Sequence, residues 1–424
     1  MKNQFVPSAL LLAAQFLVAL PPAVRAQSLP PLSFEAAWER VLRNHPTIEA
    51  AEHGIRAAEA RERQAALMPN PEVSVEVENV LGSSPMSRLR EAETTFQYSQ
   101  ALEIWGSRDR RTRAAALETE IIRREREAGL AELLYDTRRG FISVAAAEER
   151  LALVEQQVQA IERSVQAASR RVTAGRSSPV ELLRLQVALA GSRIALESAR
   201  KTLDGTRQSL ALLWGGTEPD FSRTEGTFAE IPRLPDFAAI AGQLENTAGL
   251  RRADAESSAI SGQIELEAVR WKPVPSGSIG IRHLNGPNAV ALVGGIAFPL
   301  PVLNRNQESI RALRETLLQT EAARNALRIS LLQELRRWWT EATIAHGEAE
   351  TIRAQALPQV ASALEESRRR YETGAGSYME LLDTNQTWFD LHSRYLDALT
   401  SCHLAIAALE RPFTGGISAG SAHP

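Results

Sequence analysis

An internal duplication constrains the fold of this chain more than any other feature of its sequence. The segment from Ala174 to Leu183 aligns without a gap with the segment from Thr373 to Leu382. Two prolines of each half also correspond, namely Pro69 and Pro71 with Pro273 and Pro275. Each half is predicted to contain a helix, two short strands, a very long helix, a tight turn and another long helix. The chain is therefore predicted to be one structural unit repeated twice.

The duplication sets the expected boundaries of the parts of the chain. A connector rich in Gly, Pro and Thr is expected between the repeats, and short strands are expected to precede a helical hairpin in each repeat. The first repeat is expected at 27–214, with strands at about 70–80 and 93–103 and a hairpin at 108–213. The connector is expected at 215–235, the second repeat at 236–411, its strands at about 274–284 and 289–298, its hairpin at 306–409, and a tail at 412–424.

The first residues have the features of a cleavable signal peptide. Lys2 is followed by an apolar stretch from Ala9 to Leu20 and by the small-residue cleavage pattern that ends at Ala26. We therefore expect 1–26 to be removed on export. The chain has one cysteine, Cys402, which does not follow the cleavage site, so we expect neither a lipid anchor nor a disulfide within a subunit.

Both arms of each predicted hairpin have apolar residues at alternating spacings of three and four, which is the pattern of a coiled-coil seam. In the first hairpin the seam consists of Leu151, Val154, Val158, Ile161, Val165, Ala168 and Val172, then Leu182, Leu185, Leu189, Ser192, Leu196, Ala199 and Leu203. The stretch from Arg108 to Val172 contains no proline. A continuous helix of that length spans roughly 100 Å, which is typical of a fibrous element or of a bridge between distant places.

The four predicted strands alternate apolar and polar residues. In the first, Val73, Val75 and Val77 alternate with polar residues. Such segments of about ten residues suit a membrane barrel with lipid outside and water inside, although a single such strand is better explained by a soluble hairpin packed on helices. Four strands in an exported, duplicated chain favour the barrel. Because four strands cannot close a barrel, and unpaired backbone groups in lipid cost several kcal/mol each, we expect copies of the chain to assemble.

The composition and the spacing of reactive residues argue against catalysis, bound metal and nucleic acid. Basic and acidic residues nearly balance, at 48 against 51, which gives no electrostatic footprint for nucleic acid. No histidine is spaced from another His or Cys as metal ligands are. The seven histidines are His45, His53, His283, His346, His392, His403 and His423. We find no nucleophile elbow, phosphate loop or zincin helix either, and expect no enzyme activity and no cofactor.

The order of elements, the duplication and four short runs together resemble the TolC-type outer-membrane efflux channels over nearly the whole mature chain. These runs are Asn44-His45-Pro46, Pro69-Asn70-Pro71-Glu72, Phe298 to Gln307, and Tyr371 to Asp383. Within that family the second and third runs look most like the CzcC-like branch, which serves heavy-metal pumps of the resistance-nodulation-division (RND) class.

The resemblance implies a fold, a location and partners. The implied fold is mainly α with a small β part, a trimeric TolC-like α/β barrel in which four transmembrane strands per subunit complete a twelve-stranded barrel, continued by a helical tunnel across the periplasm. The implied location is the outer membrane of a Gram-negative bacterium. The implied partners are two further copies of the chain, outer-membrane lipid, a periplasmic adaptor (membrane fusion protein) and an inner-membrane RND pump.

The resemblance also assigns a periplasmic gate to Tyr371, Glu380 and Asp383. Glu380 and Asp383 are three residues apart and face nearly the same way on a helix, so a trimer would gather six carboxylates at one opening. Such a ring concentrates cations. The first repeat keeps Glu181 but has Arg184 where Asp383 stands. An exposed acidic pair favoured by the helix dipole explains the same residues equally well.

The two turns between hairpin arms are assigned by resemblance to adaptor docking. Gly175 and Gly374 stand where a helix stops and reverses, so a left-handed backbone is expected at both. The remaining turn residues in this assignment are Arg176, Ser178, Ala375 and Gly376. Gly376 occupies a position where some family members have a basic residue that helps latch the closed state, so the latch here is either weaker or uses Arg176.

The expected function is a passive export duct for an RND-type pump, with heavy-metal cations of the cobalt, zinc, cadmium or copper class as cargo. A drug or small-molecule channel of the same family is the first alternative. The second is a soluble periplasmic coiled-coil protein, such as an adaptor or a spacer, whose strands pack on its own helices. The sequence leaves the cargo open because a passive duct needs a compatible bore and charge more than specific ligands.

Overall fold

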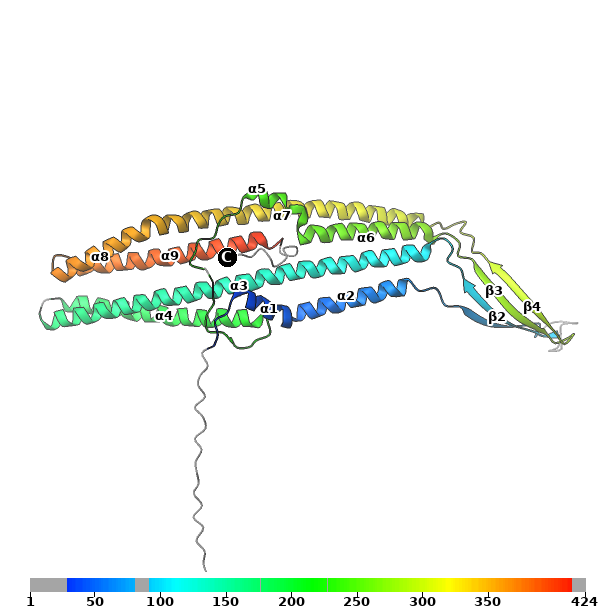
Figure 1. Ribbon diagram of the computed structural model, residues 1–424, viewed down its shortest axis with the longest axis horizontal. Coiled ribbons are helices and arrows are strands. Elements are labelled where there is room, and N and C mark those ends of the chain that lie inside the picture. The colour runs from blue at the N-terminus through cyan, green and yellow to red at the C-terminus, as the bar shows by residue number, and fades with distance from the viewer. Residues whose placement is uncertain (1–28, 81–90, 176, 227, 414–424) are drawn as a thin grey trace, which may run out of the picture.

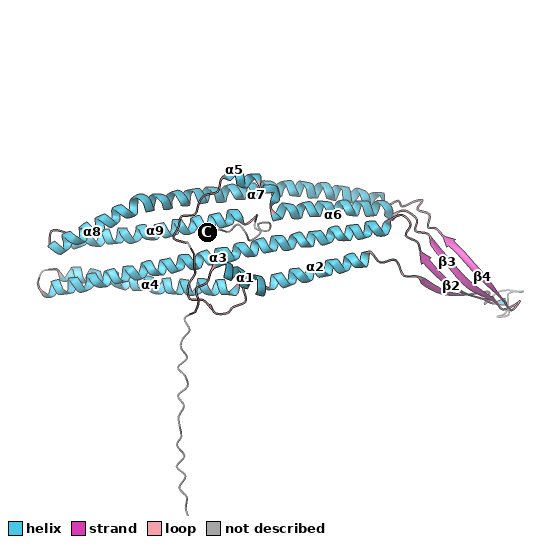
Figure 2. Cartoon of the chain, in the orientation of Figure 1, coloured by secondary structure: helices cyan, strands magenta, loops and turns pink. Residues whose placement is uncertain are grey.

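The computed structural model describes residues 29–80, 91–175, 177–226 and 228–413, and in these the chain is long and narrow. Helices run along the long axis, and a sheet lies at one end. The turns of the two helical hairpins, between α3 and α4 and between α8 and α9, lie at the other end (Figures 1 and 2). The predicted signal peptide, Arg176 and the tail from 414 onward lie outside the described residues.

The element order of the first half is repeated, with small differences, in the second. The first half consists of α1 (Phe34–Asn44), α2 (Pro46–Ala65), β1 (Glu72–Glu78), β2 (Glu93–Ala101), α3 (Ser107–Thr173) and α4 (Pro179–Leu212). The second consists of α5 (Phe237–Gly242), the short η2 (Leu244–Asn246), α6 (Ala248–Arg270), β3 (Ser276–Leu284), β4 (Ala289–Ala297), α7 (Gln307–Thr351), η3 (Ile352–Ala356), α8 (Leu357–Thr373) and α9 (Tyr378–Glu410).

The long helix of the first half is continuous, as the absence of proline predicts. α3 has 67 residues, and it starts after Gly106, whose φ of 67° lies in the left-handed region. The matching arm of the second half changes its helical form, because the π-helical segment η3 joins α7 to α8 and ends two residues before Pro358. Proline has no N–H for the carbonyl four residues earlier, and a π-helical turn accommodates that lost hydrogen bond.

The predicted seam residues of the first hairpin lie where its two arms, α3 and α4, pack on each other. Val158 and Ala168 of α3 and Leu185 and Leu203 of α4 are buried. Among the described residues, no helix is both long enough and apolar enough to cross a membrane.

The connector crosses the middle of the helices and is held by polar contacts. Trp339 donates its indole N–H to the carbonyl of Pro235 (3.2 Å). The His403 ring stacks on Phe228 and its Nε2 lies 3.0 Å from the carbonyl oxygen of that residue. Burial lowers the pKa of His403, which keeps the ring neutral against the connector.

The four strands form one antiparallel sheet in the order β1-β2-β3-β4. The register places Val75, Phe96, Ile281 and Leu292 in one row across the sheet, and all four side chains are more than half exposed. Within the described residues β1 and β4 are each paired on one side only. The sheet thus has one exposed apolar face and two open edges.

The opposite face of the sheet is polar. Arg282 forms ion pairs with Glu78 (3.3 Å) and Glu93 (2.9 Å), and its Nε donates to the Thr95 hydroxyl (3.0 Å). Gly280 lies on the same face, where a Cβ would stand 2.5 Å from the carbonyl oxygen of Phe96. A larger residue at that position would push β2 and β3 apart.

Candidate functional site

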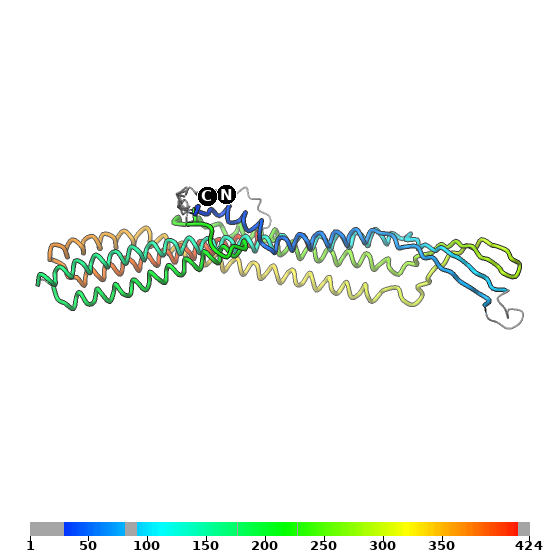
Figure 3. Tube along the Cα trace, turned by 90° about the horizontal axis from the view of Figure 1, so that it is seen from below, coloured from blue at the N-terminus to red at the C-terminus, as the bar shows by residue number. Residues whose placement is uncertain are grey.

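The two hairpin turns lie together at the end of the molecule farthest from the sheet (Figures 1 and 3). Gly175 and Gly374 have φ values of 68° and 79°, so the predicted left-handed backbone is present at both. Ser178 and Ser377 cap the next helices by accepting hydrogen bonds from the N–H groups of Val180 and Met379. Ser178 therefore has a structural task in addition to any docking role.

Gly376 is required by the close approach of the chain to Arg370. A Cβ at Gly376 would stand 2.8 Å from the Cβ of Arg370 and 3.1 Å from its carbonyl carbon. The N–H groups of Ala375 and Gly376 both donate to the carbonyl of Arg370 (2.9 Å each). A basic residue at position 376 would thus displace the turn. The sequence of the turn alone does not reveal this steric contact with Arg370.

The two acidic residues of the predicted gate have different surroundings. Both lie exposed in the first turns of α9. Glu380 pairs with Arg370 across the turn (3.4 Å), whereas Asp383 has no ion pair with any residue that the structure describes. The structure thus brings a basic partner to Glu380 from α8, and Asp383 is the carboxylate with the less compensated charge.

Tyr371 does not lie with these two acids but between the two hairpins. Its hydroxyl donates to Glu181 Oε1 (3.2 Å), and the Arg171 guanidinium lies 4.5 Å from its ring centre. The Ser177 hydroxyl also donates to Glu181. Tyr378 packs against Tyr371, with ring centres 5.7 Å apart. We call Arg171, Ser177, Glu181, Tyr371 and Tyr378 the tip cluster.

Burial and the neighbouring Glu181 carboxylate raise the pKa values of both tyrosines of the tip cluster. Tyr371 therefore remains a protonated donor to Glu181 throughout the neutral range. Because Glu181 belongs to α4 and Tyr371 to α8, this hydrogen bond ties one hairpin to the other at their turns. The sequence marked Glu181 as an acid shared by both repeats, but nothing local indicated its partner 190 residues away.

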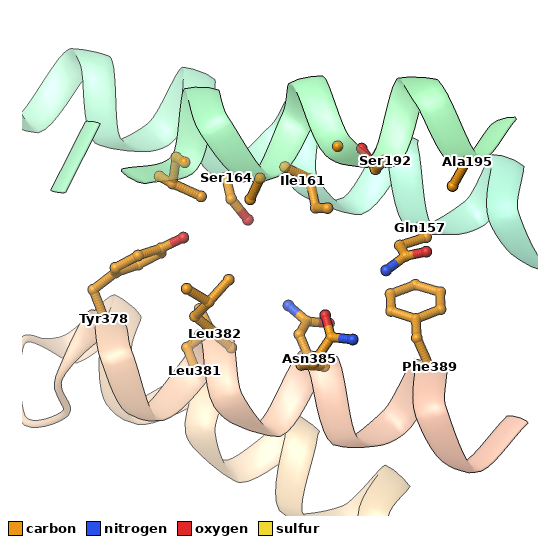
Figure 4. A pocket seen from close by; sticks show the side chains of 14 residues that line it. Gln157, Ile161, Ser164, Ser192, Ala195, Tyr378, Leu381, Leu382, Asn385 and Phe389 are labelled. Carbon is orange, nitrogen blue, oxygen red and sulfur yellow. The ribbon is translucent and has the colours of Figure 1, made fainter. Parts of the chain in front are cut away.

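A cavity of about 270 Å³ separates the hairpins next to the tip cluster. Figure 4 shows Tyr378, Leu382, Asn385 and Phe389 of α9 facing α3 and α4 across it. On the α4 side the cavity is lined by Leu185 and by four smaller residues, Ala188, Gly191, Ser192 and Ala195. The hairpins are thus joined by the tip cluster at their turns and by the ion pair between Arg150 and Asp397 farther along, with the cavity between these two contacts.

A second apolar stripe on α4 has no partner within the described chain. Val180, Leu183, Val187 and Ile194 are each more than half exposed, while Leu185 of the same helix is buried against α3. Spacings of three, four and seven residues put the exposed set on one helix face. α4 can therefore pack on two sides, one of them against another polypeptide.

The described residues hold no group of three or more His, Cys, Asp or Glu side chains arranged for a metal ion. The acids of the hairpin ends are exposed and spread along helices.

Comparison with known proteins identifies the family. A family model described as outer membrane efflux protein matches residues 37–216 and 240–413, one match for each half of the chain. The cobalt-zinc-cadmium resistance protein CzcC of Cupriavidus metallidurans is 28% identical over 397 residues, covering 92% of each chain. The nickel and cobalt resistance protein CnrC of the same species is 29% identical over 369 residues, covering 85% of this chain and 79% of CnrC.

Solved structures show the same fold at low sequence identity. The outer-membrane channel OprN superposes with a TM-score of 0.74 at 16% identity and 90% coverage of each chain. The open-state MtrE outer-membrane channel of Neisseria gonorrhoeae superposes with a TM-score of 0.72 at 15% identity and 98% coverage of each. Because the family model covers both halves, the resemblance found in the sequence is confirmed: this protein belongs to the outer membrane efflux protein family and is a channel component, not an enzyme.

Proposed function

We propose that three copies of this chain form an export duct for heavy-metal cations, with a twelve-stranded barrel in the outer membrane and a helical tunnel in the periplasm. The faces and the edges of the sheet are the main support for this proposal. It has one exposed apolar face, one polar face with Arg282, Glu78 and Glu93, and two open edges. Joining β4 of one copy to β1 of the next satisfies the edges, and three copies give an even strand number within the range of bacterial barrels.

The stripe on α4 supports the same assembly from the helical end. In a ring, Val180, Leu183, Val187 and Ile194 would pack against a hairpin of the neighbouring copy, which removes from water an apolar surface that a monomer leaves exposed. Two copies would supply only eight strands, and the interior of an eight-stranded barrel is largely filled by side chains. A ring of three leaves a passage.

The cargo is proposed from the relatives named for cobalt, zinc, cadmium and nickel resistance. We expect the protein, expressed with its own adaptor and RND pump in a Gram-negative host that lacks metal efflux channels, to restore growth on cobalt, zinc or cadmium. A host that lacks its drug efflux channel should gain no drug resistance. Restored drug resistance without metal resistance would assign the channel to small molecules.

The acids at the periplasmic end are proposed to favour cations at the mouth of the duct. Planar-bilayer recordings of the Glu380→Gln, Asp383→Asn double variant should show lower cation selectivity and weaker block by divalent cations. Because Arg370 already pairs with Glu380, Asp383→Asn alone should cause most of the loss. Asp204→Asn, which removes an exposed acid of α4 roughly 40 Å from the turns, is the control and should change neither property. Unchanged selectivity in the double variant would refute the gate assignment.

The turns are proposed to receive the periplasmic adaptor, since they are exposed and lie at the end opposite the sheet. Ala375→Trp should reduce crosslinking to the adaptor severalfold while the trimer yield stays the same. Ala361→Trp, at an exposed position of α8 roughly 20 Å from the turn, is the matched control. Ser178 is a poor probe because its substitution also removes the cap of α4. Equal crosslinking by both variants would argue against docking at the turn.

A further inference from the structure

A recess of about 370 Å³ lies where the helices of the second half meet the sheet. Its two walls are the segment that leads from α6 into β3 and the segment that leads from β4 to α7, at the helix–sheet junction in Figure 1. Arg270, Trp271 and Lys272 line the first wall, and Leu300 and Asn304 line the second. The recess therefore combines two cations, an indole ring and an apolar side chain.

Lys272 is held in place without being neutralised. The indole N–H of Trp105 donates to the carbonyl of Pro273 (2.6 Å), and the Lys272 ammonium lies 5.5 Å from the centre of the same indole. No carboxylate among the described residues forms an ion pair with Lys272. Arg270 pairs with Glu267 of its own helix (2.9 Å), but its side chain remains 73% exposed. The Lys272 ammonium is thus available to an anion in the recess, and Arg270 adds a mostly exposed guanidinium that it shares with Glu267.

The surroundings of the recess are apolar. Leu300, Val302 and Leu303 are 78%, 73% and 91% exposed, and Trp271 is 37% exposed. They follow Ile296 and Phe298, so they continue the apolar face of the sheet toward the helices. Trp beside Lys at the edge of such a face is the composition of a membrane–water interface, where indole rings anchor and cations reach the headgroups.

The equivalent place in the first repeat has a different chemistry. The prolines that correspond in the two repeats put Leu67 and Met68 opposite Trp271 and Lys272. Only three of the 48 basic residues are lysine, namely Lys2, Lys201 and Lys272. The recess at that junction also contains Arg61 and Arg111, but it has Leu67 and Met68 in place of an indole and an ammonium, so the Trp271-Lys272 pair is a property of one repeat.

We propose that this recess binds the phosphate-bearing headgroup of an anionic phospholipid in the leaflet that faces the periplasm. Arg270 and Lys272 contact the phosphate, Trp271 lies at the glycerol level, and an acyl chain runs along Leu300 and Val302. This inference rests on the proposed insertion of the sheet into the membrane. The phosphate of a lipid fits the recess better than free phosphate because the adjoining surface is apolar.

The test is native mass spectrometry of the full chain in mixed micelles with equal amounts of phosphatidylglycerol and phosphatidylcholine. Each spectrum reports the number of subunits and the retained lipid together, so failure of the trimer and failure of the lipid site are read separately. Wild-type protein should retain phosphatidylglycerol preferentially. The Trp271→Leu, Lys272→Met variant has the residues of the first repeat at these positions and should keep its oligomeric state. Its ratio of retained phosphatidylglycerol to phosphatidylcholine should be about fivefold lower than that of the wild type, as expected for the loss of one surface cation. Lys201→Met is the control and should behave as wild type.

Amine-reactive labelling gives a second readout. Phosphatidylglycerol should protect Lys272 from labelling and leave Lys201 reactive, whereas phosphatidylcholine or inorganic phosphate should protect neither. Equal retention of the two lipids by wild-type protein, or unchanged preference in the double variant, would overturn the proposal. Protection of Lys272 by inorganic phosphate alone would identify a simple anion site instead of a lipid site.

Discussion

Tyr371→Phe is expected to raise the open probability of the channel by about a hundredfold. The substitution removes the hydrogen bond to Glu181, which joins the two hairpins at the tip cluster. A hydrogen bond of this kind contributes about 1 kcal/mol net to the closed state. If three subunits open together, the free energy that favours the closed over the open state falls by about 3 kcal/mol. The apolar cluster around Leu185 and Tyr378 remains in the variant, so the experiment measures the loss of this hydrogen bond alone. Single-channel recording in planar bilayers measures the effect.

Tyr378→Phe is the matched control for this experiment. The Tyr378 hydroxyl is buried and has no hydrogen-bond partner within the described part of the chain. Its removal therefore takes away no link between the hairpins, and the ring contact with Tyr371 remains. We expect Tyr378→Phe to conduct as the unmodified channel does. Equal open probabilities for both variants would mean that the hydrogen bond between Tyr371 and Glu181 does not hold the tip closed.

Val75→Arg is expected to abolish insertion into the membrane, whereas Glu76→Arg is expected to be tolerated. The two residues are neighbours in β1 and point to opposite faces of the sheet. On the lipid side an arginine near the middle of the bilayer costs about 2–4 kcal/mol, and a trimer carries three copies. On the polar side it joins Arg282, Glu78 and Glu93 next to water.

The measurement is the yield of heat-resistant, membrane-embedded protein after expression, compared between the two variants. The same new side chain is placed at adjacent positions, so the strand propensity of arginine itself does not distinguish the variants. If both variants insert equally well, the apolar face of the sheet does not face lipid, and the packing of the strands on another protein becomes the better explanation.

Features that depend on local sequence were predictable. Alternation of Val73, Val75 and Val77 indicated an apolar strand face, and all three are exposed on one face of the sheet. The left-handed backbone at Gly175 and Gly374 followed from the need to reverse a helix there. Both properties are set by residues a few positions apart, which is the range over which a sequence pattern carries information.

Features that depend on contacts between distant segments were not predictable. Tyr371 meets Glu181 only because the two repeats lie side by side, and Lys272 meets Trp105 for the same reason. The steric need for Gly376 arises from Arg370, six residues earlier but on the opposite side of the turn. The π-helical segment before Pro358 was not predicted, although the proline is a local signal for an altered helix there.

The duplication, the open edges of the sheet and the second apolar stripe on α4 all lead to one central claim, which is assembly of three copies. The mass of the particle in detergent tests that claim most directly. Native mass spectrometry should show a stable species close to three times the mass of the mature chain, below three times the 46.5 kDa of the full sequence. A stable monomer or dimer at the same detergent concentration would contradict it.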